Sequence, residues 1–174
     1  EMCIRDSTDS TGSTTALVQD NRVLQIPDDN YRTYYELFVY SFYDSDGDGI
    51  GDLQGVLEKL DYLNDGDDTT DMDLGINGIW LMPVMPSVTY HKYDTTDYEN
   101  IDPQYGTLET FQELLTACHD RGIRVILDLA MNHSSSRHPW FLQATEYLKN
   151  LPEGAEPDSS ECPYIAVSYT HLRA

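Results

Sequence analysis

The 174-residue sequence has little positive charge, few cysteines and no long apolar run. Ten lysines and arginines stand against 31 aspartates and glutamates, and the net charge of −21 argues against nucleic acid or an anionic membrane as a partner. No apolar run reaches about 18 residues, so the sequence predicts no membrane span. The sequence is nevertheless 40% hydrophobic and 11% aromatic, which predicts a folded domain with a buried core.

Both ends of the sequence look foreign to the rest. Residues 1–7 (EMCIRDS) and 167–174 (VSYTHLRA) resemble one translated sequencing adapter read in opposite directions, and we expect them to be artefacts. Without them the net charge is unchanged and two cysteines remain, which do not make a disulfide framework. On this interpretation the native ends of the protein are missing, so the lack of a signal peptide is uninformative.

The stretch at 124–133 (RVILDLAMNH) begins apolar and ends in the polar side chains of Asp128, Asn132 and His133. Its β-branched start after a glycine predicts a buried strand. Strands that are apolar throughout are typical of parallel sheets with helices on both faces. Since such folds place their chemistry at the carboxyl ends of strands, this stretch predicts both an architecture and a site.

Two more strands and two helices are expected before this stretch. Dense aromatic and β-branched residues predict the strands, and leucines at helical spacing predict the helices. The expected ranges are 33–43 and 76–84 for the strands, and 53–64 and 107–121 for the helices. The second helix is expected to bury Leu108, Phe111, Leu115 and Cys118. Alternating strands and helices predict an α/β fold with a parallel sheet, either a closed barrel or doubly wound.

The remaining segments have other compositions. Residues 8–30 are rich in Ser, Thr, Asp and Asn, which predicts a polar lead-in without regular structure. Residues 64–73 form an acidic loop, and residues 86–105 form a long loop rich in Tyr and Asp. Long loops in compact domains are often functional. One short helix is expected at 140–149.

Carboxylates recur at every second position directly after the first expected strand. Close carboxylates repel one another unless a cation lies between them, and Ca²⁺ takes six to eight oxygen ligands. The loop therefore predicts a structural Ca²⁺ site, with these ligands: Asp44, Asp46, Asp48, the backbone carbonyl of Ile50, and Asp52. It is not a complete EF-hand, because Gly55 occupies position 12, where a bidentate Glu is required. A solvated acidic turn is the alternative.

Four segments in order resemble the catalytic domain of glycoside hydrolase family 13, the α-amylase family. They are YYELFVYSFYDSDGDGIGDLQGVLEKLDYL, LGINGIWLMPVMPS, YHKYDTTDYENIDPQYGT and RGIRVILDLAMNHSSSRHPWF. The resemblance implies a (β/α)8 TIM barrel, of which residues 31–133 hold strands 1 to 3 with helices 1 and 2. It further implies that residues 134–166 begin a domain inserted after strand 3.

The resemblance also implies roles for single residues. It implies sugar contacts from Tyr93, His133 and His91, and structural support of the site from Asp128 and Asn132. A flat tyrosine ring suits the C–H face of a pyranose, in agreement with the implied role of Tyr93. A purely structural histidine is the alternative for His133. Lys92 departs from the family, which usually has glycine there, and this leaves the local backbone shape open.

The implied activity is that of a retaining α-glycosidase hydrolysing α-glucosidic bonds in starch, maltodextrin or related oligosaccharides. The family's catalytic Asp, Glu and Asp follow strands 4, 5 and 7, none of which is expected in this sequence. The 174 residues alone are therefore expected to be inactive. An α-glucan transferase or trehalose-forming enzyme on the same barrel is one alternative. A calcium-dependent binding or docking module is another, although it would require a second copy of the acidic loop, which is absent.

Composition also predicts a location. The acidic surface and the Ser/Thr-rich lead-in favour an exported bacterial enzyme, extracellular or attached to the cell surface. Within the family resembled, a histidine at the position of His91 is seen in amylase-type members, so the resemblance favours an endo-acting amylase over an exo-acting glucosidase.

Overall fold

The centre of the fold is a parallel three-stranded sheet in which strand order follows chain order. The computed structural model describes residues 16–19 and 22–166. Its strands are β3 (Tyr34–Leu37), β4 (Gly78–Leu81) and β5 (Arg124–Leu127). The two expected artefacts, residues 1–7 and 167–174, lie outside the described residues and stay a prediction. The parallel sheet confirms the predicted α/β architecture.

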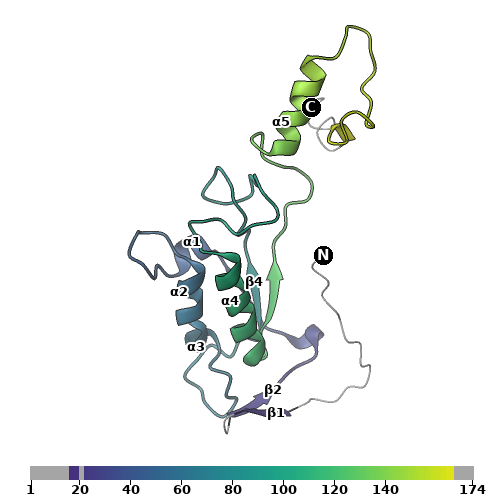
Figure 1. Ribbon diagram of the computed structural model, residues 1–174. Helices are drawn as coiled ribbons and strands as arrows, with labels where there is room; N and C mark the ends of the chain where they lie inside the picture. The colour runs from purple at the N-terminus through teal and green to yellow at the C-terminus, as the bar shows by residue number, and fades with distance from the viewer. Residues whose placement is uncertain (1–15, 20–21, 167–174) are drawn as a thin grey trace.

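Helices connect the strands and cover one side of the sheet (Figure 1). Between β3 and β4 the chain forms α1 (Val39–Phe42), α2 (Leu53–Glu58) and α3 (Leu60–Leu63). Between β4 and β5 it forms α4 (Leu108–Asp120), which packs against α2. The last helix, α5 (Pro139–Lys149), projects away from the sheet (Figure 1). Two successive strand–helix units of this kind are the repeating element of a (β/α)8 barrel.

The main core lies between the sheet and these helices. The first predicted helix is interrupted at Lys59 (φ −106°, ψ 8°), so it appears as α2 and α3. Its predicted apolar spacing holds across the break, because Leu53, Val56, Leu60 and Leu63 are all buried. The second helix begins as predicted, since the Thr107 hydroxyl accepts the Thr110 N–H at 3.2 Å.

The apolar stripe of α4 differs from the prediction. Phe111, Leu114 and Cys118 are buried, whereas Leu108 is 42% exposed and Leu115 is partly buried. Leu114 and Leu115 lie three and four residues after Phe111, and both spacings fall on the same face of a helix, so spacing alone does not choose between them. In the structure Leu114 is fully buried, and Leu115 packs against the same core while remaining partly exposed.

The first strand and the lead-in also differ from the prediction. The strand expected over 33–43 ends at Leu37, and the chain turns directly into α1. The lead-in is not entirely irregular, because β1 (Ala16–Gln19) and β2 (Arg22–Gln25) pair as an antiparallel hairpin, followed by the 3-10 turn η1 (Asp29–Tyr31). The hairpin places β-branched Val18 opposite Val23, a short-range signal that the polar composition of the segment conceals.

The predicted full burial of the third strand is wrong for β5. Ile126 is 45% exposed, and Trp80, its partner in register on β4, is 43% exposed. Both side chains lie on the sheet face that the described helices leave open. In a closed barrel this face is the packed interior, so its apolar character agrees with the barrel architecture.

Candidate functional site

The carboxyl ends of β3, β4 and β5 meet at one edge of the sheet because the strands are parallel. Three loops leave this edge: residues 43–52, 82–107 and 128–138. All the predicted site residues lie on these loops. This is the end of the sheet where barrel enzymes place binding and catalytic groups.

Tyr93 is the centre of a hydrogen-bonded group that includes Asp128 and His133. Its hydroxyl donates to Asp128 Oδ2 at 2.5 Å, and this bond, with burial, raises the pKa of Tyr93 to about 12. His133 Nε2 lies 2.8 Å from the Tyr93 carbonyl oxygen, so Nε2 carries the proton and donates. The structure therefore brings together three of the five residues predicted for the sugar site.

The other two predicted residues lie beside this group. His91 Nδ1 accepts the Tyr93 N–H at 3.2 Å, and the two rings are 6.0 Å apart. Asn132 is exposed and directly precedes His133 in the chain. Tyr90, which is 65% exposed, contacts the His91 ring and extends the aromatic surface outward. The contacts place His91 within the site, while the roles of His91 and Asn132 stay predictions.

Tyr98 is a site residue that the sequence did not reveal. Its hydroxyl lies 2.9 Å from the Ala130 carbonyl oxygen and 2.6 Å from the His133 carbonyl oxygen, so it joins the long loop to the loop that follows β5. Nothing except its place in a Tyr-rich loop could have indicated this. A cavity of about 270 Å³ opens beside it, lined by Tyr98, Leu129, Met131, His133, Ser134 and Trp140.

Lys92 is a second residue whose role was not recognised. It is 1% exposed, and its backbone adopts φ 64°. Lys92 is the only non-glycine residue with positive φ among residues 16–19 and 22–166. Such a conformation costs about 1–3 kcal/mol, which explains why glycine suits this position. Its Nζ bonds Asp102 Oδ2 at 2.7 Å and Gln104 Oε1 at 2.8 Å.

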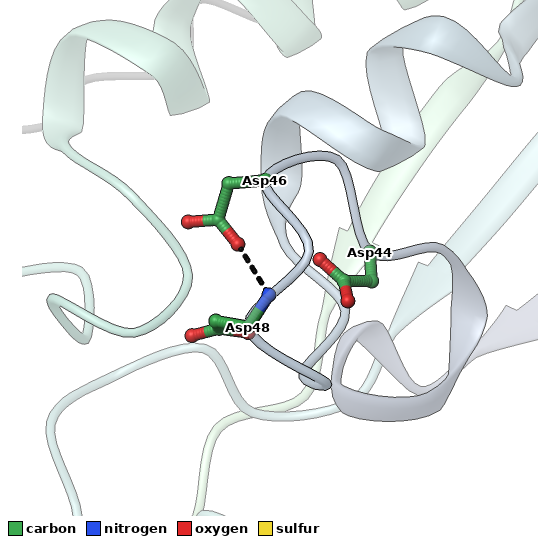
Figure 2. Close-up of side chains that lie close together, drawn as sticks. All are labelled: Asp44, Asp46 and Asp48. Carbon is green, nitrogen blue, oxygen red and sulfur yellow. Dashed lines mark hydrogen bonds between the residues drawn. The ribbon is translucent and has the colours of Figure 1, made fainter.

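The acidic loop gathers three of its four carboxylates (Figure 2). One oxygen each from Asp44, Asp46 and Asp48 lies within 4.8 Å of the others. Backbone N–H groups turn the loop inward, because Gly47 and Gly49 donate to the Asp44 carboxylate at 2.7 and 2.8 Å. These bonds hold the pKa of Asp44 below its usual value. Three hard oxygen donors this close fit a divalent cation such as Ca²⁺.

Asp52, predicted as a fourth carboxylate ligand, is not in this cluster and caps α2 instead. Its Oδ1 accepts the Gly55 N–H at 2.6 Å, and its Oδ2 accepts the Ser45 N–H at 2.9 Å. The Ser45 hydroxyl donates to it as well. Asp is a preferred N-cap, and its position before Leu53 was sufficient to predict this role. Ile50, the predicted carbonyl ligand, donates its N–H to Asp48 at 2.7 Å.

His138 caps the amino terminus of α5 through a nitrogen that can be protonated, so the stability of this region is expected to depend on pH. Its Nδ1 accepts the Trp140 N–H at 3.1 Å, which requires that nitrogen to be unprotonated. Burial lowers the pKa of His138, and the charge of Asp97 opposes this in part. The unfolded value is about 6.5. Because the unfolded chain binds the proton more readily, stability present above pH 6.5 is lost as the pH falls through the lowered folded pKa.

We therefore expect the unfolding temperature of the full-length protein to fall more steeply between pH 7 and pH 5 in the wild type than in His138→Asn. Asparagine retains an N-cap acceptor but does not titrate in this range. Thermal unfolding followed at intervals of pH measures the difference. Parallel pH profiles for the two proteins would contradict the prediction.

A family model described as the catalytic domain of alpha amylase matches residues 36–164. The chain belongs to the α-amylase family, glycoside hydrolase family 13. The solved structure of Eubacterium rectale Amy13B is similar, with a TM-score of 0.72 and 64% identity, over 79% of this chain and 25% of that one. The resemblance inferred from the four sequence segments is thus confirmed.

The curated relatives differ in the activities that their names give. Alpha-amylase 3 of Dictyoglomus thermophilum is 52% identical over 64% of this chain and 21% of its own length. Alpha-amylase SusG of Bacteroides thetaiotaomicron is 47% identical over 75% of this chain and 16% of its own. Further relatives include an oligo-1,6-glucosidase and a trehalose-6-phosphate hydrolase. The chain thus spans about a fifth of the length of these relatives, and the relatives named here are glycoside hydrolases.

Proposed function

We propose that the chain is part of a retaining α-glycosidase that hydrolyses α-glucosidic bonds in starch, maltodextrin or related oligosaccharides. The observation that carries the proposal is the Tyr93–Asp128–His133 group at the carboxyl edge of the sheet. Asp128 holds the Tyr93 hydroxyl from one side, and His133 holds its carbonyl from the other. The ring is fixed in place as a surface on which a pyranose can stack.

In this proposal the chain binds and orients the sugar, and the catalytic carboxylates come from elsewhere in the enzyme. Retaining enzymes need a nucleophile and a general acid/base about 5–5.5 Å apart. Asp128 is occupied by the Tyr93 hydroxyl, so it acts as a positioning group. With a pKa of about 12, Tyr93 stays neutral at working pH and keeps this hydrogen bond.

Replacing Tyr93 in the complete enzyme tests the proposal. Tyr93→Ala removes the ring, and loss of a stacking contact of about 0.5–1.5 kcal/mol lowers kcat/KM for maltopentaose by roughly 2–10-fold, more if the loop shifts. Tyr93→Phe keeps the ring and should lose less. Tyr62→Ala, on the exposed side of α3, is the matched control and should leave kcat/KM unchanged.

Reducing-sugar release and product chromatography measure the outcome. If the wild-type enzyme releases no sugar from starch, maltodextrin or maltopentaose, the proposal fails. Products longer than the substrate would favour the α-glucan transferase alternative instead. Trehalose among the products would favour the trehalose-forming alternative.

We also propose that Asp44, Asp46 and Asp48 bind a structural Ca²⁺, with the Ile50 carbonyl as a further ligand. The support is the closeness of the three carboxylate oxygens. The ion would neutralise their mutual repulsion and stiffen the loop that leads into Asp52 and α2. It supplies no chemistry to the sugar site in this proposal.

Calcium is expected to raise the unfolding temperature of the chelator-treated complete enzyme. At a concentration 100-fold above Kd the stabilisation is about 2.7 kcal/mol. Asp46→Asn should abolish most of the shift, whereas Asp71→Asn, an exposed acid in the 64–73 loop, should leave it intact. An equal calcium shift in Asp46→Asn and wild type would place the ion elsewhere.

We propose that the enzyme is exported by a bacterium to the cell surface or the medium. The support is compositional: a net charge of −21 with 31 acidic residues. Within the described part of the chain, no helix is long and apolar enough to cross a membrane. Immunoblots of cell, surface and medium fractions test the location, and retention in the cytosol would overturn it.

A further inference from the structure

Lys92 combines two features that are each unfavourable alone. Its backbone is left-handed at φ 64°, which side chains other than glycine rarely adopt. Its ammonium group is buried, and an unpaired buried charge is strongly unfavourable. A residue that carries both features persists only where its surroundings hold it there.

The Lys92 ammonium group has two hydrogen-bond acceptors and one aromatic ring around it. Nζ donates to Asp102 Oδ2 at 2.7 Å and to Gln104 Oε1 at 2.8 Å, and it lies 4.9 Å from the centre of the Tyr105 ring. An ammonium has three N–H donors, so two hydrogen bonds and one cation–π contact satisfy it. The ion pair joins residues ten apart across the long loop.

Asp102 anchors this arrangement to the sheet. It is 5% exposed, its backbone N–H donates to the Val84 carbonyl at 2.8 Å, and Val84 lies three residues beyond the end of β4. The Asp102 carboxylate also accepts the Ser87 and Gln104 N–H groups. Lys92 is therefore tied, through Asp102, to the rigid part of the fold.

The residue that directly follows this anchor is Tyr93. A change of backbone conformation at residue 92 would rotate both the Tyr93 ring, which reaches Asp128, and the Tyr93 carbonyl, which reaches His133. We propose that Lys92 is a positioning residue for the sugar site: its buried ion pair with Asp102 holds the left-handed backbone that aims Tyr93. This proposal rests on the proposed function, because the orientation of the Tyr93 ring matters for activity only if that ring binds the sugar.

The test separates stability from activity in the complete enzyme. Lys92→Met leaves Asp102 buried without its cation, and should lower both the unfolding temperature and kcat/KM for maltopentaose. Misplacement of a binding group by about 1 Å costs up to roughly 100-fold, so we expect a loss of about 10–100-fold. Lys92→Met/Asp102→Asn removes the unpaired charge, and should recover most of the unfolding temperature while kcat/KM stays low. Lys92→Arg keeps the charge and should restore part of kcat/KM.

A second measurement asks whether Lys92 acts through Tyr93. In a Tyr93→Ala background, Lys92→Met/Asp102→Asn should change kcat/KM by less than about twofold, because no ring remains to be aimed. A double variant that regains activity along with stability would overturn the proposal, as would effects of the Lys92 and Tyr93 changes that multiply independently. These results differ from failure of the proposed function, in which the wild-type enzyme itself cleaves no α-glucan.

Discussion

Gly55→Ala is expected to destabilise the complete enzyme by about 3 kcal/mol or more. Helix propensity alone would predict the opposite change in stability, because Gly55 lies within α2. Alanine is favoured over glycine inside a helix by about 1 kcal/mol. The steric effect decides the sign. A Cβ on Gly55 would lie 2.1 Å from the Tyr43 carbonyl oxygen, a backbone atom that cannot move without shifting the end of α1.

The same close approach occurs at Gly51, near the end of the acidic loop and four residues before Gly55. A Cβ on Gly51 would lie 2.0 Å from the Val39 carbonyl oxygen. The Gly51 N–H also donates a hydrogen bond to the Tyr40 carbonyl oxygen at 2.7 Å. The end of the acidic loop and the first turn of α2 are thus both packed closely against α1 and its C-cap residue Tyr43.

Thermal and urea unfolding of Gly55→Ala and Gly154→Ala test this prediction. A Cβ on Gly154 meets nothing within 4 Å, so its cost should be limited to the strain of its positive φ, about 1–2 kcal/mol. If the two variants are equally stable, close packing of α2 against Tyr43 is not what requires glycine at position 55.

The packing at Gly55 also explains why the acidic loop is not an EF-hand. Gly55 occupies the position where an EF-hand places its bidentate glutamate. Here that position is buried in the first turn of a helix, against a backbone carbonyl, with no space for a side chain. The sequence showed the missing glutamate, but only the contact with Tyr43 gives the physical reason.

Local signals predicted the elements well because each depends on neighbouring residues. Short stretches of sequence were enough to predict the apolar spacing of α2 and α3, the start of α4 close to residue 107, and the apolar strands. The three carboxylates of the acidic loop were equally accessible, since they lie within five residues. Resemblance to the family added the grouping of Tyr93 with Asp128 and His133, which lie 35 and 40 residues away from it in the sequence.

The unpredicted features depend on distant partners. The Arg32 side chain is 2% exposed. One of its guanidinium nitrogens donates hydrogen bonds to the Asn77 and Gly122 carbonyl oxygens, 45 and 90 residues away. These bonds join the segments that precede the three strands at the amino-terminal edge of the sheet. The Lys92–Asp102 pair required the backbone conformation of residue 92. No local pattern in sequence encodes such contacts, because a charged residue in a loop is normally solvated.

The 174 residues expressed alone are expected to be aggregated or poorly folded, and to release no reducing sugar from starch. The reason lies in the sheet. On its open face, Glu36, Trp80 and Ile126 lie side by side on the three neighbouring strands. The Trp80 and Ile126 side chains are nearly half exposed there. Along β5, no strand of the described residues pairs with the outer edge, so its backbone N–H and C=O groups are free to pair with other chains.

Size-exclusion chromatography, thermal unfolding and a reducing-sugar assay on the purified chain check this expectation, with the complete enzyme as the control. Trp80→Lys offers a matched variant. If the uncovered face drives aggregation, a charge at its centre should make the isolated chain more soluble, while burying that charge in the closed barrel should destabilise the complete enzyme. A monomeric isolated chain with one cooperative unfolding transition would contradict the folding argument. Sugar release by that chain would contradict the assignment of catalysis to carboxylates outside it.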